Sequence, residues 1–122
     1  MKPVADEIKR LTKATRFSMQ GIVYAFKNEA AFRTDVIIAL VLLPIALLLE
    51  VTTVERVLLV GSVLLLLIVE LLNTAVEAAI DRISREHHPL SGIAKDMGSA
   101  AVLFSLIFGA FTWGTILFDL WF

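Results

Sequence analysis

The chain has 122 residues, of which 58% are hydrophobic and 19% are charged, and its formal net charge is −1. A chain of this length forms one domain, and so apolar a composition excludes an ordinary soluble domain, whose surface must be polar enough to hold water. The absence of cysteine from the sequence excludes disulfide bonds and thiol chemistry.

An amphipathic helix over residues 5–27 is the first predicted element. Its apolar residues recur every three or four positions and basic residues occupy another face, as in helices that lie in the plane of a membrane interface. Positive charge extends over roughly thirty residues without an apolar core, so we expect no cleavable signal peptide. The expected partner of these cations is an anionic membrane surface and not nucleic acid. The basic residues of this region are Lys2, Lys9, Arg10, Lys13, Arg16, Lys27 and Arg33.

Three apolar segments follow, and we predict that they form transmembrane helices over residues 30–49, 53–84 and 93–120. The first must include the polar stretch Ala30–Asp35 to cross a hydrocarbon core about 30 Å thick, and Asn28 is predicted to be its N-cap. Thr52 or Thr53 is predicted to cap the second. Small residues in the first half of the third would let neighbouring helices approach closely.

The distribution of Lys and Arg predicts how the chain is oriented in the membrane. Basic residues crowd the N-terminal segment and surround the loop between the second and third spans, whereas the first loop carries only Arg56. By the positive-inside rule, the N-terminus and the second loop face the cytoplasm. The predicted fold is therefore a single all-α, multi-pass integral membrane domain over residues 1–122, in which an N-terminal surface helix precedes three transmembrane helices.

Polar residues interrupt the second span along one helical stripe. When each residue advances about 100°, Asn73, Glu77 and Asp81 all fall within about 60° of Glu70. A carboxylate at the depth of an apolar run costs about 3 kcal/mol or more unless it is solvated, paired or protonated. Glu70 and Glu77 could be polar contacts between helices, paired with Lys95 or Arg82. The pattern favours the other interpretation, an ion or phosphate site, because ionisable residues within a membrane are usually functional.

No standard nucleotide motif, zinc spacing or nucleophile elbow is present in the sequence, so nucleotide chemistry would require an unusual site. The groups that phosphoryl transfer needs are nevertheless available at one membrane face. Glu29 and Glu77 could hold Mg²⁺, which favours one or two carboxylates together with phosphate oxygens. Arg10 and Lys95 could contact the phosphates, and the deeper Glu70 could deprotonate an alcohol.

Three segments resemble the signature segments of prokaryotic diacylglycerol kinases: Asn28–Arg33, Val69–Arg82 and Leu90–Ala101. The resemblance in length and layout covers essentially the whole chain. It implies a small enzyme of the bacterial inner membrane that forms a homotrimeric helix bundle. Such enzymes use ATP with Mg²⁺ to phosphorylate the free hydroxyl of diacylglycerol, and the product is phosphatidic acid.

The resemblance also implies roles for individual residues. Glu70 matches the catalytic base, Asn73 matches an amide that supports the active site, and Glu29 and Glu77 match the metal-binding carboxylates. Phe17 stands where well-known members carry a tyrosine, which implies stacking on the adenine without a hydroxyl contact. The residues implied to bind nucleotide are Arg10, Phe17, Glu29, Glu77, Glu86, His87, His88, Lys95 and Asp96. Those implied to contact the lipid substrate are Arg10, Ser18, Ala31, Asp35, Arg56, Glu70, Ser99 and Trp113.

Other functions are compatible with parts of the pattern. An undecaprenol kinase would use the same chemistry and a similar acidic helix, and only the acceptor would differ. A small ion-translocating subunit could use Glu70 and Glu77 as a relay, but it would not need the cations and the His87–His88 pair gathered at one face. A non-catalytic amphipathic scaffold would explain the N-terminal helix but not the buried acids.

Overall fold

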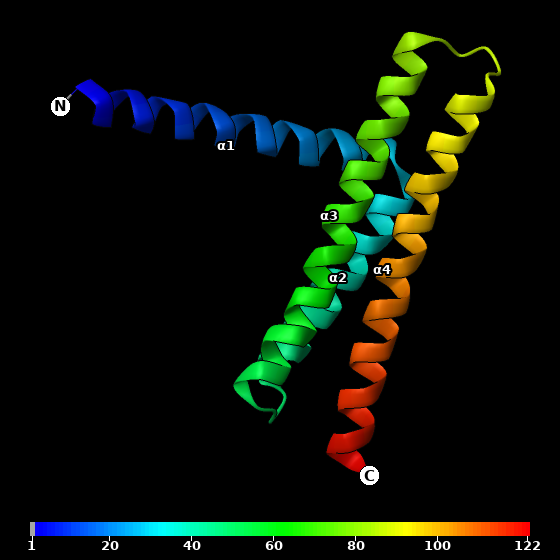
Figure 1. The fold of residues 1–122 in the computed structure, drawn as a ribbon. Coiled ribbons are helices and arrows are strands. Elements are labelled where there is room, and N and C mark those ends of the chain that lie inside the picture. Colours follow the sequence, from blue (N-terminus) through cyan, green and yellow to red (C-terminus); the bar gives the residue numbers. More distant parts are fainter. Residues whose placement is uncertain (1) are drawn as a thin grey trace.

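A computed structural model describes residues 2–122 of the chain. It contains four helices and no strand within those residues (Figure 1): α1 (Lys2–Asn28), α2 (Ala30–Leu48), α3 (Thr53–Ile83) and α4 (Pro89–Trp121). The last three are long and apolar enough to cross a membrane. The prediction of an all-α chain with three membrane-length helices is therefore confirmed.

The second, third and fourth helices end, and the second and third begin, within about one residue of the predicted bounds, but α1 begins at Lys2 and not at residue 5, and two further predictions at helix N-termini are wrong. Helix α4 begins at Pro89 and not at residue 93, because His88 Nδ1 accepts a hydrogen bond from the Leu90 amide at 3.1 Å and proline is well suited to the first turn. Asn28 does not cap α2. It is the last residue of α1, where its side chain donates to the Tyr24 carbonyl at 2.8 Å, and Glu29 takes the extended N-cap position without a side-chain cap hydrogen bond.

Side chains satisfy the backbone at the turn between α2 and α3. Thr52 caps α3, as one of the two predicted residues, and forms a reciprocal capping box with Glu55, with hydrogen bonds of 3.2 and 3.0 Å. The Arg56 guanidinium donates to the carbonyls of Ala46 and Leu47 at 2.7 and 2.8 Å. Those carbonyls belong to the last turn of α2 and have no partner within the helix. Both ends of this turn are therefore held by side chains.

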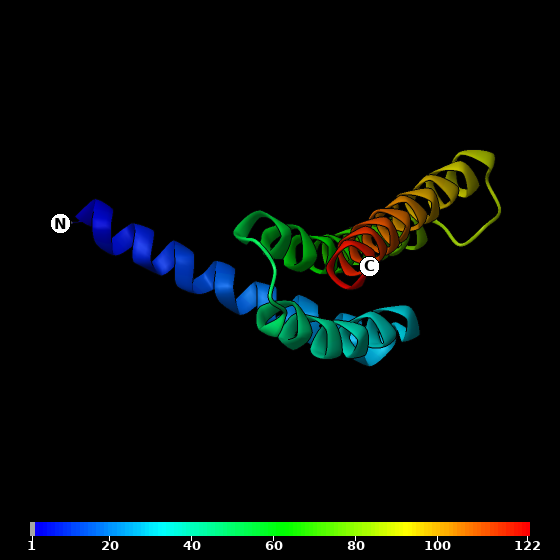
Figure 2. The same ribbon diagram turned by 90° about the horizontal axis from the view of Figure 1, so that it is seen from below.

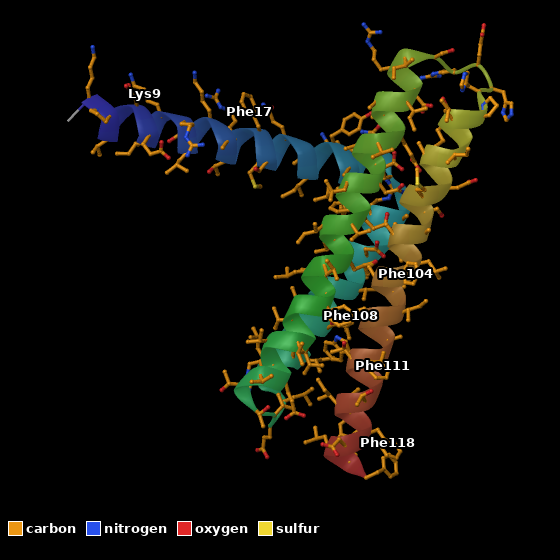
Figure 3. All side chains as sticks on the ribbon, in the orientation of Figure 1. Lys9, Phe17, Phe104, Phe108, Phe111 and Phe118 are labelled. Atoms are coloured by element: carbon orange, nitrogen blue, oxygen red, sulfur yellow. The ribbon has the colours of Figure 1, made fainter. Side chains whose placement is uncertain are left out.

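Helix α3 lies centrally in the bundle and packs against both α4 and α2. Figure 2 shows α3 and α4 side by side, with α2 against one face of the pair. Ala46, Leu59 and Ile116 form a small core where the three helices meet. Most large apolar side chains remain exposed, including Phe104 and Phe111 on α4, which point away from the bundle (Figure 3). Such extensive apolar surface fits contact with lipid or with other chains and not with water.

Helix α1 extends away from the bundle at a steep angle to the other helices (Figure 1). Ala25, near its C-terminal end, is its only buried residue among those described. The joint with α2 is held by Arg33, whose Nη1 donates to the carbonyls of Phe26 and Lys27 at 2.9 and 3.1 Å. These two carbonyls belong to the last turn of α1 and have no partner within the helix. Arg33 therefore satisfies the C-terminal carbonyls of α1 as Arg56 satisfies those of α2. The location of α1 on the membrane surface stays a prediction.

One side-chain hydrogen bond joins α3 to α4 in the half of the bundle remote from α1. Trp113 Nε1 donates to Ser62 Oγ at 3.1 Å, and Ser62 in turn donates to the Leu59 carbonyl of its own helix at 2.9 Å. Ser62 is almost fully buried. Hydrogen bonds of this kind between membrane helices stabilise them because the apolar surroundings offer no alternative partner.

We expect Ser62→Ala to reduce the free energy of unfolding by on the order of 1 kcal/mol, because it leaves the Trp113 N–H without an acceptor. Thermal unfolding in detergent would measure this change. Ser105→Ala is the matched control, since Ser105 is equally buried but its hydroxyl bonds only to the Val102 carbonyl of its own helix. Equal losses in the two variants would contradict a role of the Ser62–Trp113 bond between helices.

Candidate functional site

Two buried carboxyl groups meet where the beginning of α2 packs on the second half of α3. Asp35 and Glu70 are each only 7% exposed, although they stand in helices of membrane length. Their side chains interact directly, and the charges of Glu29 and Glu77 act on Glu70 as well. Asp35 Oδ2 has no hydrogen-bond partner. Over residues 2–122 neither Asp35 nor Glu70 forms a salt bridge, so no cation of the described chain offsets this pair.

A cavity of about 440 Å³ lies at the same end of the bundle. Glu29 from the α1–α2 joint and Glu77 from α3 both line it, although a whole transmembrane helix separates them in sequence. The remaining lining residues are Tyr24, Thr74, Ala78, Asp81, Arg82 and Arg85. The fold therefore gathers three carboxylates and two guanidinium groups around one space.

The donor set of this cavity fits a magnesium ion held jointly by protein and phosphate. No group of three or more acidic, histidine or cysteine side chains converges on one point within residues 2–122, so a site made of protein ligands alone is not formed there. Mg²⁺ is commonly bound through one or two carboxylates, with the remaining positions filled by water and substrate phosphates. Glu29 and Glu77 provide that number of carboxylates.

Asn73 connects this cavity with the α3–α4 interface. Its Nδ2 donates to Glu77 Oε1 at 3.4 Å, one helical turn further along α3. Its Oδ1 is buried and has no hydrogen-bond partner. A carboxylate oxygen can only accept, so this orientation of the amide is the one in which Asn73 steadies Glu77.

A smaller cavity of about 200 Å³ lies beside the loop between α3 and α4. It is lined by Ile80, Asp81, Ser84, Arg85, Glu86, His87, His88, Ser91, Gly92 and Lys95. Lys95 Nζ binds Asp81 Oδ1 at 3.0 Å, which corrects the suggestion that Lys95 neutralises Glu70 or Glu77. Asp81 and Arg85 line both cavities, so the two spaces are neighbours on α3.

Several residues expected at the site lie elsewhere in the single chain. Phe17 is 63% exposed on the part of α1 that projects from the bundle (Figure 3). Arg10 is bound to Glu7 of the same helix, and this contact holds the pKa of the Glu7 carboxyl below its usual range. Arg56 and Trp113 make their contacts in the opposite half of the bundle, with Leu47 and Ser62 respectively. The carboxylates thus come together within one chain, and these four side chains do not join them.

Ser18 lies beside a different space, an apolar cavity of about 420 Å³ between α1 and α3. Ala31, Asp96 and Ser99 are exposed.

Two features of the site were not predicted from the sequence. The polar stripe included Asp81 but did not predict its pairing with Lys95, and nothing in the sequence pattern singled out Tyr24. A helical period shows which residues share a face, whereas the lining of a cavity depends on the element packed opposite.

Comparison with known proteins identifies the family. The family described as prokaryotic diacylglycerol kinase matches residues 16–117. A diacylglycerol kinase of Pseudomonas aeruginosa is 53% identical over 110 residues, which cover 90% of this chain and 89% of that protein. One from Escherichia coli (strain K12) is 50% identical over 110 residues, covering 90% of each. One from Helicobacter pylori (strain J99) is 42% identical over 120 residues, covering 98% of this chain and 94% of that protein.

The chain belongs to the prokaryotic diacylglycerol kinase family. A member of the diacylglycerol kinase family is a lipid kinase, which requires a nucleotide as the phosphoryl donor. The three long apolar helices agree with an enzyme that resides in a membrane and receives its substrate there. The predicted family and enzyme class are confirmed.

The buried carboxyl pair of this diacylglycerol kinase family member has a consequence for its stability. We expect Asp35→Asn to increase the free energy of unfolding by on the order of 1 kcal/mol, because it removes one of two adjacent buried acids and supplies a donor for Glu70. Thermal unfolding in detergent would measure the gain. Asp119→Asn is the control, since Asp119 is an exposed acid at the far end of α4. A loss of stability in Asp35→Asn alone would show that Asp35 is held by favourable contacts instead.

Proposed function

We propose that this protein is an ATP-dependent kinase that phosphorylates the free hydroxyl of diacylglycerol and releases phosphatidic acid. The observation that carries the proposal is the arrangement of carboxylates at two depths. Glu70 is buried among the helices, while Glu77 lines an open cavity two helical turns, or about 10 Å, nearer the end of α3. A lipid hydroxyl arriving from the membrane and a nucleotide arriving from water would meet between them.

Glu70 is the general base in this proposal. Its carboxylate accepts the proton of the lipid hydroxyl as that oxygen attacks the γ-phosphorus of ATP. A new phosphorus–oxygen bond forms to the lipid, the bond to the bridging oxygen of ADP breaks, and ADP leaves with the electron pair. The depth of Glu70 supports this role, because a lipid headgroup reaches that level more readily than a nucleotide does.

Glu29 and Glu77 hold the nucleotide end of the site. Magnesium bound by these two carboxylates would neutralise charge on the β- and γ-phosphates. Asn73 orients Glu77 through its amide, and Arg82 and Arg85 line the same cavity, where they are able to contact phosphate oxygens. The second cavity, with Glu86, His87, His88 and Lys95, adjoins it and would receive the rest of the nucleotide, near Asp96.

The complete site requires more than one chain. Arg10, Phe17 and Ser18 stand on α1, most of which has no contact with its own bundle, so a neighbouring subunit would receive that helix. We propose a homotrimer in the bacterial inner membrane, with the N-terminus and the α3–α4 loop in the cytoplasm. Of the remaining substrate contacts expected from the resemblance, the exposed Ala31 and Ser99 would face the lipid or a subunit interface, and Asp35 would act beside Glu70. Arg56 and Trp113, in the other half of the bundle, would contact the lipid chains.

A product assay decides the acceptor. The purified full-length chain in mixed micelles is given labelled ATP, Mg²⁺ and either diacylglycerol or undecaprenol, and labelled phosphatidic acid is the expected product. Labelled undecaprenyl phosphate in its place would reassign the acceptor while leaving the chemistry of Glu70 unchanged. Absence of transfer to both alcohols would contradict the proposed function.

We expect Glu70→Gln to fold and bind ATP with Mg²⁺ almost normally but to lose about 100-fold or more in kcat, the usual scale for a lost general base. Glu70→Asp should recover little, because the shorter side chain withdraws the oxygen from the hydroxyl. Steady-state kinetics with separate nucleotide-binding measurements would separate the two effects. A variant that keeps its turnover but binds Mg²⁺ or ATP poorly would make Glu70 a metal ligand and not the base.

We expect Glu29→Gln and Glu77→Gln each to raise the Mg²⁺ concentration required for half-maximal activity by about 10-fold or more, because each removes one carboxylate from a shared ion. The double variant should be little worse than either single variant, as for residues that act as a unit. Titration of activity with Mg²⁺ at fixed ATP would measure this. Independent, additive effects would place the two residues at different sites. Glu50→Gln serves as the control, because Glu50 is an exposed acid in the turn between α2 and α3, at the opposite end of the bundle.

A further inference from the structure

Gly98 on α4 lies directly against the side chain of Asn73 on α3. A Cβ atom built at Gly98 would overlap Asn73 Oδ1 and would lie 3.2 Å from Asn73 Cγ and 3.8 Å from Asn73 Cβ. The other glycines of the described chain are different, because a Cβ added to any of them would meet nothing within 4 Å. These glycines are Gly21, Gly61, Gly92, Gly109 and Gly114. Gly98 is therefore the one position among them where a missing side chain makes room for another residue.

The nature of this contact separates it from ordinary close packing of helices. A glycine that serves helix approach allows two backbones to come together, and an added Cβ would then meet the opposing backbone. The three atoms nearest to a Cβ at Gly98 all belong to the side chain of Asn73. The space left by Gly98 is thus filled by a polar side chain that belongs to the candidate site.

The orientation of the Asn73 amide depends on that space. Asn73 Nδ2 points to Glu77 Oε1 at 3.4 Å, whereas Oδ1 is buried without a hydrogen-bond partner. Exchanging the two ends of the amide would place an oxygen against the Glu77 carboxylate, which cannot donate a hydrogen bond. The oxygen must therefore point away from Glu77, toward α4, and only a residue without Cβ leaves it room there.

We propose that Gly98 is a positioning residue for phosphoryl transfer: it seats the Asn73 amide so that Nδ2 holds Glu77 in the orientation that faces the cavity. The inference rests on the proposed role of Glu77 and extends it by one residue on another helix. An added methyl group at Gly98 forces the Asn73 amide to rotate or α4 to move away. In either case Glu77 loses its hydrogen bond and its fixed direction.

The test compares Gly98→Ala with Gly109→Ala on the same helix in the full-length protein. For Gly98→Ala we expect the Mg²⁺ requirement to rise by about 10-fold, as when other outer partners of metal ligands are removed. Binding of Mn²⁺ in the presence of a nonhydrolysable ATP analogue, followed by electron paramagnetic resonance, should weaken by a similar factor. Gly109→Ala should change neither quantity, since its methyl group meets open space within the chain.

The double variant Gly98→Ala/Asn73→Ala separates positioning from general damage to the fold. Removing the Asn73 amide removes the atoms that the methyl group would strike, so Gly98→Ala should have almost no additional effect on Mn²⁺ affinity or thermal stability in that background. If Gly98→Ala fails to fold, the double variant should regain folding. A double variant that remains unfolded, or equal effects of Gly98→Ala in both backgrounds, would overturn the proposal.

The outcomes also distinguish this inference from the proposed function. An unchanged Mg²⁺ requirement in Glu77→Gln would contradict the metal role of Glu77, and with it the catalytic meaning of Gly98. If Glu77→Gln raises the requirement while Gly98→Ala matches Gly109→Ala in Mn²⁺ affinity and stability, only the positioning role fails.

Discussion

Burial of carboxyl groups inside apolar helices is the constraint on which the rest of this structure depends. Glu70 and Asp35 stand in apolar stretches of α3 and α2 and are almost completely buried. An isolated carboxylate in such surroundings costs several kcal/mol, and the described chain supplies no cation to pair with either residue. The two acids therefore have each other as their main polar neighbours.

Side chains also supply the hydrogen bonds that the helix ends lack. A backbone group without a partner is costly in an apolar environment, so each turn brings side chains to the ends of the helices. Arg33 serves the last carbonyls of α1, Arg56 serves those of α2, and the capping box of Thr52 and Glu55 begins α3. Arginine suits the two carbonyl ends because one guanidinium reaches two acceptors. These contacts also fix the angle at which α1 leaves the bundle and therefore where its basic residues are presented.

In a single chain, much of the surface of the helices is not covered by other helices. Helix α1 buries one residue, and α4 exposes several phenylalanine side chains. Lipid can cover the phenylalanines, whereas the cavity rimmed by Glu29, Arg82 and Arg85 is open on one side in the single chain. In the proposed homotrimer, neighbouring copies would supply the missing walls of this cavity.

The sequence by itself determined the three membrane-length helices and the stripe of polar residues along α3. Apolar runs of membrane length specify spans through their own hydrophobicity, and the period of the α-helix places Glu70, Asn73 and Glu77 on one face without reference to any other element. Helix starts were less predictable. Asn28 was expected to be a cap from its residue type and His88 was not expected to be one, whereas the cap is decided by which backbone amides the turn leaves within reach. Only the tertiary structure decided that Asp35 faces Glu70, that Lys95 pairs with Asp81, and that Gly98 lies against Asn73. Each of these contacts joins residues on different helices, and their partnership depends on the rotation and offset of the packed helices, which no local pattern encodes.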